Sequence, residues 1–239
     1  RDAQWIYNNP AARADDLMAA FADPSIKGIV ASIGGDDAIR LIPHLDLSVI
    51  RDNPKAFIGY SDATVLHFGC LKAGVGSLHG PSVMSGFAEN GGMSTLSSTS
   101  FYRAAFVASP IGELARNVEG WTAEHVSWED PSNQERLRRR SASNGAQRLR
   151  GNGRASGHLI GGCAEVLEML KSTPWWPPPA YWDNAILFYE TSEEAPADEF
   201  VLRWLRNFAA QGILQRLSGL ILARPGGDMN DARCESQKA

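Results

Sequence analysis

The chain has 239 residues, a formal net charge of −4 and a hydrophobic content of 44%. A chain of this length can bury a core in one large domain or in two smaller ones. The small negative charge gives no reason to expect nucleic acid or an anionic membrane as the main partner. No run approaches the roughly 20 apolar residues that a membrane span needs. We therefore expect neither partner.

The three cysteines, Cys70, Cys163 and Cys234, are odd in number and widely spaced. This pattern favours reduced, mostly buried thiols over a disulfide framework or a zinc site. We therefore expect no bound metal. Unpaired thiols also suit a cytoplasmic protein.

The amino-terminal part alternates short apolar runs with helical patterns. Strands are predicted at 29–33, 56–59 and 75–79, and helices from Asn9-Pro10 to Pro24, at 38–41 and at 63–72. A proline at the first helical position supports the start at Asn9-Pro10. Short buried strands that alternate with helices are typical of a parallel sheet covered on both faces.

Residues 109–155 break this alternation. They contain Trp121, Trp128 and a basic stretch from Arg136 to Arg154. Because turn residues are frequent and a packing pattern is missing, we expect a connector or mobile loop. The basic stretch is either a solvated loop or a clamp for an anionic substrate group.

Regular structure is predicted to resume with the run from Gly157 to Gly162. The expected elements are a helix over 163–171, a strand over 185–189 that ends in Glu190, a helix over 198–211 and a last strand over 220–223. The helix over 198–211 is amphipathic. We expect its inward face to carry Phe200, Leu202, Leu205 and Phe208.

These elements predict an α/β fold of two domains. An N-terminal parallel-sheet domain is expected over residues 1–115, a linker or loop over 116–155, and a smaller C-terminal α/β domain over 156–239. The last strand is followed by a polar tail without a packing pattern. We therefore expect the C-terminal domain to be incomplete.

The most informative stretch is residues 56–72, where an apolar run ends at Gly59 and a helical pattern follows Ser61 at once. A serine at such a corner is held out of the sheet, beside unpaired N–H groups at the helix start that favour a developing anion. This is the geometry of a nucleophile elbow, although Gly-Tyr-Ser-Asp-Ala differs from the hydrolase Gly-x-Ser-x-Gly pattern. The alternative is that Ser61 or Asp62 merely caps the helix.

Other candidate residues fall at the carboxyl ends of strands, where parallel sheets bind their ligands. Gly34-Gly35 either lets a backbone N–H approach a ligand oxygen or forms an ordinary tight turn. Glu190 ends a buried strand, where its carboxylate either orients a histidine or is simply solvated. His79 ends a neighbouring strand, and Trp121 and Trp128 either stack on a flat substrate or serve packing.

The order and spacing of the motifs are more specific than any one of them. The runs that match a known pattern are Ala20 to Asp37, Asn53 to Thr64, Gly80-Pro81, Gly161-Gly162-Cys163 with Thr173-Pro174, and Ile186 to Glu194. Together they resemble the LD-carboxypeptidase family of serine peptidases, and its microcin C immunity branch in particular. The resemblance extends from about residue 10 to about residue 227, and its most specific blocks end in Asp62 and Glu190.

The resemblance implies that Ser61 is the nucleophile and Glu190 the acid of a Ser-Glu-His triad, with the backbone N–H groups of Gly35 and Asp62 as the oxyanion hole. The further candidates for contacts with substrate are Gly34, His79, Trp121 and Trp128. It also implies an α/β N-terminal domain joined to a smaller α/β domain, a homodimer, and neither a metal nor another cofactor.

The resemblance has one departure. The family's base is a histidine in a Gly-His-type motif well beyond the strand expected at 220–223, and none of the five histidines of this chain matches it. The family's first strand, upstream of Arg1, also lacks a counterpart. Because triad members act as a unit, we expect the chain as given to be inactive or nearly so, and its full-length parent to be a hydrolase.

Two substrate classes stay open. One is a cell-wall tetrapeptide cleaved before a terminal D-alanine, and the other is an aminoacyl group joined to a nucleotide-like moiety. Trp121, Trp128 and the basic stretch favour the second, because tryptophan can stack on a purine and arginine can face phosphate. A rival from another class is a binding module that keeps the pocket without the base. A nucleotide-binding domain that uses Gly34-Gly35 has less support, because the phosphate-loop pattern is missing.

Overall fold

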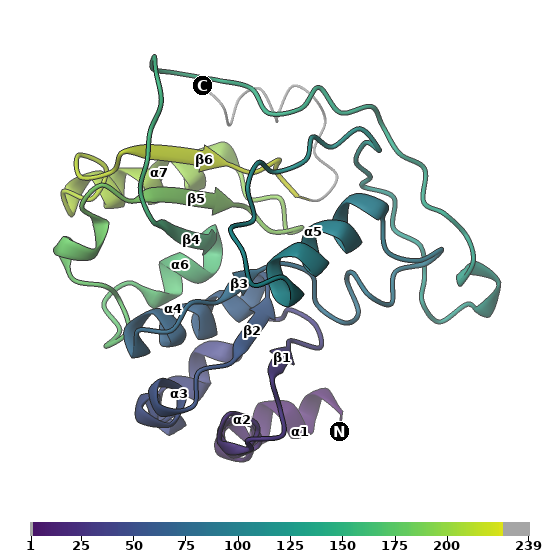
Figure 1. The fold of residues 1–239 in the computed structure, drawn as a ribbon, viewed down its shortest axis with the longest axis horizontal. Coiled ribbons are helices and arrows are strands. Elements are labelled where there is room, and N and C mark those ends of the chain that lie inside the picture. The colour runs from purple at the N-terminus through teal and green to yellow at the C-terminus, as the bar shows by residue number, and fades with distance from the viewer. Residues whose placement is uncertain (1, 227–239) are drawn as a thin grey trace.

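The computed structural model describes residues 2–226, which form two separate three-stranded parallel sheets with helices packed around them (Figure 1). The first sheet has the order β1-β2-β3, and the second has the order β4-β5-β6. The expected α/β class with parallel strands is confirmed. Cys234 and the end of the expected C-terminal domain lie outside the described residues.

The first sheet is built from β1 (Gly28–Val30), β2 (Ala56–Gly59) and β3 (Leu78–His79). The helices of this half are α1 (Ala3–Asn8), α2 (Pro10–Ala22), α3 (Leu47–Asp52) and α4 (Thr64–Ala73), with 3-10 turns η1 (Ala38–His44) and η2 (Ser61–Ala63). The register pairs Gly59 with His79. Both strands therefore deliver their last residues to the same edge of the sheet.

The second sheet is built from β4 (Leu159–Cys163), β5 (Ile186–Glu190) and β6 (Gly219–Leu222). Its helices are α6 (Ala164–Leu170) and α7 (Asp198–Ala210), with a 3-10 turn η4 (Pro179–Trp182). The register pairs Cys163 with Glu190. The carboxyl ends of β4 and β5 therefore lie beside each other.

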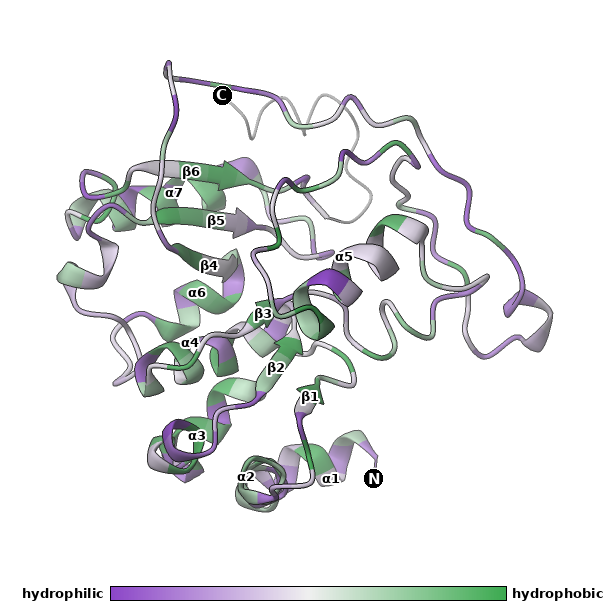
Figure 2. Ribbon diagram, viewed as in Figure 1, coloured by the Kyte–Doolittle hydropathy of each residue, from purple (hydrophilic) through white to green (hydrophobic). Residues whose placement is uncertain are grey.

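Helix α4 belongs to both hydrophobic cores. On the face of α4 toward the first sheet, Cys70 is buried beside Phe21 and Phe57. On the other face, Val65 and Phe68 are buried with residues of the second sheet. A helix that is buried on opposite sides needs apolar residues on more than one face, and most residues of α4 are hydrophobic (Figure 2). The division expected at 1–115, 116–155 and 156–239 stays a prediction.

The two halves meet where α4 begins. The Thr64 side chain is fully buried, and its hydroxyl oxygen accepts a hydrogen bond of 3.1 Å from the backbone N–H of Cys163. The preceding residue, Gly162, has φ +146°, and a Cβ built on it would lie 2.5 Å from Thr64 Oγ1. Glycine is needed here because a larger residue would push the two halves apart.

The structure corrects the expected inward face of the helix over 198–211. Phe208 and Val201 are buried, but Phe200 is 50% and Leu202 49% exposed. Successive residues are about 100° apart on a helix, so positions 200 and 202 cannot share the buried face with 208. Val201, Leu205 and Phe208 follow the helical spacing and face the core.

Three helices were not predicted from the sequence, namely α1, α3 and α5 (Thr95–Phe106). Each has a capping side chain, since Asp2 accepts from the Trp5 N–H, Asp46 from the Ser48 N–H and Ser94 from the Ser97 N–H. The run 94–100 is rich in serine and threonine, which are weak helix formers in a helix interior. Capping and contacts with the connector offset this weakness.

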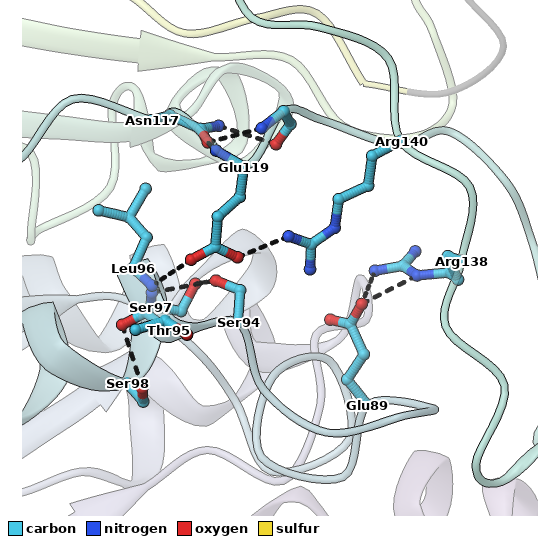
Figure 3. A network of polar contacts seen from close by, with 11 residues as sticks. Glu89, Ser94, Thr95, Leu96, Ser97, Ser98, Asn117, Glu119, Arg138 and Arg140 are labelled. Atoms are coloured by element: carbon cyan, nitrogen blue, oxygen red, sulfur yellow. Dashed lines mark hydrogen bonds and ion pairs between the residues drawn. The ribbon is translucent and has the colours of Figure 1, made fainter.

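The segment expected to be a connector or mobile loop, residues 109–155, runs over the surface with one short 3-10 turn, η3 (Pro131–Asn133). It is fastened to α5 and to the turn before it (Figure 3). Glu119 accepts from the Leu96 N–H at the start of α5 and from Arg140, and Arg138 pairs with Glu89. Trp121 and Ser141 form an antiparallel bridge within the segment.

The contact at Gly162 gives the first prediction. The variant Gly162→Ala should lose about 3 kcal/mol or more of unfolding free energy, because it combines a strained backbone with a clash against Thr64. Gly74→Ala is the matched control, since Gly74 also has positive φ (+77°) but open space around its Cβ position, and should cost about 1 kcal/mol. Urea unfolding at pH 7 measures both. Equal losses would contradict the proposed packing of the two halves.

Candidate functional site

Ser61 occupies a strained corner between β2 and α4. Its φ is +57°, a value that few residues other than glycine adopt. The side chain is partly exposed, and the buried strand β2 ends two residues before it. Strain of this kind persists only where the surrounding structure enforces it, and it is frequent at active sites. The strand–helix corner lies where the sequence predicts it, and the role of Ser61 as a nucleophile stays a prediction.

The Gly34-Gly35 turn lies directly against Ser61. A Cβ built on Gly34 would be 2.9 Å from Ser61 Oγ, and Gly35 has φ +145°. A side chain at position 34 would therefore occupy the space in front of the hydroxyl. Because glycine has no side chain, that space and the backbone N–H groups of the turn are open to a ligand.

The Asp62 side chain braces this turn. Its Oδ2 atom accepts from the backbone N–H groups of Asp37 (3.0 Å) and Ala38 (2.8 Å). Burial raises the pKa of the Asp62 carboxyl above its ordinary value, against the effect of these two hydrogen bonds. Neither η2 nor α4 has a side-chain cap of its own, so the alternative that Ser61 or Asp62 merely caps the following helix is wrong.

Two ion pairs of Asp37 also support the Gly34-Gly35 turn. The Asp37 carboxylate pairs with Arg13 of α2 at 2.5 Å and with Arg40 at 3.1 Å. Both contacts are half-buried, so they are worth more than an exposed ion pair. The path of the chain from Gly34 to Ala38 is thus fixed on one side by Asp62 and on the other by two arginines.

Glu190 at the end of β5 is paired with His79 at the end of β3. His79 Nε2 lies 3.1 Å from Glu190 Oε1, and the two side chains are 22% and 26% exposed. The contact joins the first sheet to the second across 111 residues of sequence. The carboxylate that the sequence expects to orient a histidine therefore contacts one, although this histidine is not the base that the family resemblance implies.

His67 of α4 is buried beside this pair, but it contacts a backbone carbonyl and a serine hydroxyl instead of Glu190. Its Nε2 lies 2.9 Å from the Gly59 carbonyl oxygen, and its Nδ1 lies 2.8 Å from Ser77 Oγ. Burial lowers its pKa from 6.5 to about 4, so the ring is neutral at pH 7. A neutral ring with both nitrogens engaged holds the end of β2 in place and is turned away from Ser61.

The two tryptophans expected at the substrate differ in their settings. Trp121 is half-buried, lies under the Arg224 guanidinium at 4.1 Å from the ring centroid, and lines a cavity of about 600 Å³ at the carboxyl ends of β5 and β6. Trp128 is 44% exposed on the connector. Their contacts with a substrate stay predictions.

The arginines expected to clamp an anion are in large part already paired. Arg136 and Arg139 contact Glu124, Arg138 contacts Glu89, and Arg140 contacts Glu119. An anion that approached them would have to displace these carboxylates. The first part of the basic stretch therefore fastens the connector.

In the described part of the chain, no group of three or more His, Cys, Asp or Glu side chains is arranged to hold a metal ion. Within residues 2–226, no helix has the length and apolar character that crossing a membrane requires. Cys70 and Cys163 are buried free thiols, as the cysteine spacing predicts.

The structure thus brings Ser61, Asp62, Gly34 and Gly35 together around one small space, and it links Glu190 to the same edge through His79. Neither the side-chain role of Asp62 nor the partner of Glu190 was predicted from the sequence. The role of Asp62 was indicated by the acidic residue that follows the serine. The partner of Glu190 depends on a contact between two sheets, for which the sequence has no local pattern.

The molecule is thus a two-sheet α/β protein with a serine at a strained strand–helix corner that faces a glycine turn. The chain belongs to the LD-carboxypeptidase family. The model of that family's N-terminal domain matches residues 1–80, and the model of its C-terminal domain matches residues 156–239.

Curated relatives agree with this membership. The microcin C7 self-immunity protein MccF of Escherichia coli is 28% identical over 214 residues, which cover 89% of this chain and 60% of MccF. The putative carboxypeptidase YocD of Bacillus subtilis is 32% identical over 166 residues, covering 69% of this chain and 48% of YocD. The chain thus spans less than two thirds of the length of these relatives.

Solved structures extend the similarity to the fold. An MccF-like protein from Streptococcus pneumoniae, solved in complex with AMP, has a TM-score of 0.85 at 28% identity, covering 98% of this chain and 71% of that one. MccF in complex with glutamyl sulfamoyl guanosine has a TM-score of 0.77 at 26% identity, covering 95% and 68%.

The setting of His67 predicts a pH dependence of stability. Between pH 6.5 and about 4 the unfolded state binds a proton at His67 that the folded state does not. The unfolding free energy should therefore be fully present above pH 6.5 and fall by on the order of 3 kcal/mol as the pH drops to about 4.

The measurement is urea unfolding at several pH values for the wild type, His67→Gln and His44→Gln. His67→Gln should show a shallower slope in this window, because the titrating ring is gone. His44 is exposed, so His44→Gln should keep the wild-type slope. A wild-type slope in His67→Gln would contradict the assignment.

Proposed function

We propose that the protein is a serine hydrolase that cleaves an amide-type bond through an acyl-enzyme. The observation that carries the proposal is the backbone of Ser61, held at φ +57° with Gly34 packed against its hydroxyl. Such a conformation costs free energy, and a capping role does not explain it. Membership of the LD-carboxypeptidase family supports the same chemistry.

In the proposed reaction, Ser61 Oγ attacks the carbonyl carbon of the substrate while a histidine takes the hydroxyl proton. The carbonyl oxygen becomes an oxyanion, which the backbone N–H groups of Gly35 and Asp62 stabilise. The histidine then donates its proton to the leaving nitrogen as the amide bond breaks. Water, activated by the same histidine, releases the acyl group from Ser61.

Glu190 has the role of the triad acid in this proposal. Its carboxylate accepts a hydrogen bond from the base, fixes the tautomer of that ring and stabilises the imidazolium that forms. By the family resemblance, the base is a histidine in a Gly-His-type motif, which none of the histidines of residues 2–226 matches. A chain without it would bind substrate and turn it over poorly, because the members of a triad act as a unit.

We propose an aminoacyl group joined to a nucleotide-like moiety as the favoured substrate, with a cell-wall peptide as the second candidate. MccF structures hold aminoacyl sulfamoyl nucleosides, which supports the first. Trp121 and Arg224 line a cavity large enough for part of a nucleotide. The putative carboxypeptidases among the relatives support the second.

A binding module without turnover is the alternative function. It is favoured by the His79–Glu190 contact, which occupies one oxygen of the carboxylate, while none of the histidines within residues 2–226 matches the base of the family. We also propose a homodimer in the cytoplasm, on the basis of the family and of the buried free thiols Cys70 and Cys163.

The nucleophile can be tested by labelling. The full-length protein should react with a fluorophosphonate at Ser61, and Ser61→Ala should give no adduct and lose at least about 1,000-fold in kcat. Gly34→Ala should also abolish labelling, because its Cβ would lie against Ser61 Oγ. Gly76→Ala is the matched control, since nothing lies within 4 Å of its Cβ position. Activity that survives Ser61→Ala would remove the proposal.

The substrate class can be tested by competition. The full-length protein should cleave an aminoacyl sulfamoyl adenosine in preference to a cell-wall tetrapeptide. Trp121→Leu should then raise KM for the nucleoside substrate by about tenfold, the loss expected for one stacked ring, and leave the tetrapeptide unaffected. Leu149→Ala, in the wall of the same cavity, controls for general disturbance. Exclusive cleavage of the tetrapeptide would contradict the proposed preference for the aminoacyl nucleoside and favour the cell-wall peptide as the substrate.

A further inference from the structure

The contact between His79 and Glu190 has no role in the reaction proposed so far. Glu190 Oε1 is occupied by His79 Nε2 at 3.1 Å. Among the described residues none donates a hydrogen bond to the other oxygen, Oε2. A carboxylate can accept at both oxygens at once. One oxygen of Glu190 is therefore held by the protein, and the other is available to a second donor.

The surroundings of His79 fix which form of the ring is present. Nδ1 is buried and lacks a hydrogen-bond partner within the described residues, and the ring lies 5.0 Å from Phe188 and 5.6 Å from His67 between ring centroids. A proton on Nδ1 would be a buried, unpaired donor, which is costly. A ring with its proton on Nε2 satisfies the contact with Glu190, and His79 is then a donor to the carboxylate.

The same geometry makes His79 unsuited to the roles of base and substrate ligand. Its Nε2 is engaged by Glu190, and its Nδ1 is buried out of reach of solvent. In the described structure no hydrogen bond joins His79 to Ser61. A general base must reach the proton that it abstracts, and neither nitrogen of His79 does.

The position of His79 lets it fix the Glu190 carboxylate of the second sheet relative to the first sheet. It ends β3 beside Gly59, two residues before Ser61, and the backbone N–H of the next residue, Gly80, donates to the Gly59 carbonyl. Glu190 ends β5 in the other half of the molecule. The hydrogen bond therefore ties the carboxylate to the strand next to the one that carries the nucleophile.

We infer that His79 is a positioning residue: through Nε2–H it holds the Glu190 carboxylate so that Oε2 faces the catalytic histidine. This inference rests on the proposed function. Without the donor, the carboxylate rotates about its own side-chain bonds and the catalytic imidazole loses its orientation. A displacement of about 1 Å at a reacting group can cost 100-fold in rate. The loss should fall on kcat, since His79 does not touch the substrate.

The experiment compares three variants of the full-length protein by fluorophosphonate labelling of Ser61 and by kcat and KM. His79→Phe keeps a ring against Phe188 but removes the donor, and it should lower the labelling rate and kcat by about 10- to 100-fold with KM unchanged. His79→Gln supplies an amide donor and should recover most of the rate. His44→Phe, at an exposed position, should match the wild type.

Several outcomes separate the two proposals. Failure of the wild type to label at Ser61 removes the proposed function. Normal labelling of the wild type together with normal rates in His79→Phe leaves that function standing and overturns the inference. Complete inactivity of both His79→Phe and His79→Gln, with folding intact, also overturns it, because it would make His79 the base.

A measurement on the wild-type side chain keeps the inference testable if His79→Phe does not fold. In ¹⁵N NMR of the histidine rings, His79 should carry a proton on Nε2, and Glu190→Gln should shift its Nε2 resonance. A resonance that is indifferent to Glu190→Gln would show that the contact is absent in solution and would overturn the inference.

Discussion

Helix α4 is buried in two cores at once, and the geometry of the site depends on this. Its residues pack against β2 on one side and against α6 and the second sheet on the other. Ser61 lies three positions before Thr64, the first residue of this helix, so only two residues separate it from the seam between the two halves. A rotation of one half against the other would move α4. The serine and Glu190 are therefore held in one frame although they come from different sheets.

Local features of this frame were predictable from the sequence. The corner at Ser61 follows from an apolar strand that ends at Gly59 and a helix pattern that starts at once. Recognising it requires only the hydrophobic periodicities of a strand and of a helix, and a turn residue between them. The strand over 56–59 agrees with β2 residue for residue. The glycines at 34 and 35 fall where a neighbouring strand ends, and parallel sheets place such ends together. These inferences hold because each depends on residues close in sequence.

Features set by distant contacts were not predictable. The buried face of α7 was assigned wrongly because Phe200 and Leu202 are hydrophobic yet lie on the outer face, and hydrophobicity alone does not tell which side meets a core. The partner of Glu190 comes from another sheet. The arginines of 136–140 form a charge run whose partners, Glu89, Glu119 and Glu124, precede them by 12 to 49 residues. Each of these contacts depends on the packing of the whole molecule.

The pairing of the connector changes the argument about substrate charge. Four arginines that could have met a phosphate already face carboxylates, and Figure 3 shows two of them, Arg138 and Arg140. An anion would gain little there because it must first separate an ion pair. Arg224 differs, since it lies over the ring of Trp121 at the carboxyl end of β6. Stacking leaves the edge of a guanidinium free to donate. In the proposed function, recognition of a nucleotide therefore depends on this stacked pair more than on the charge of the basic stretch.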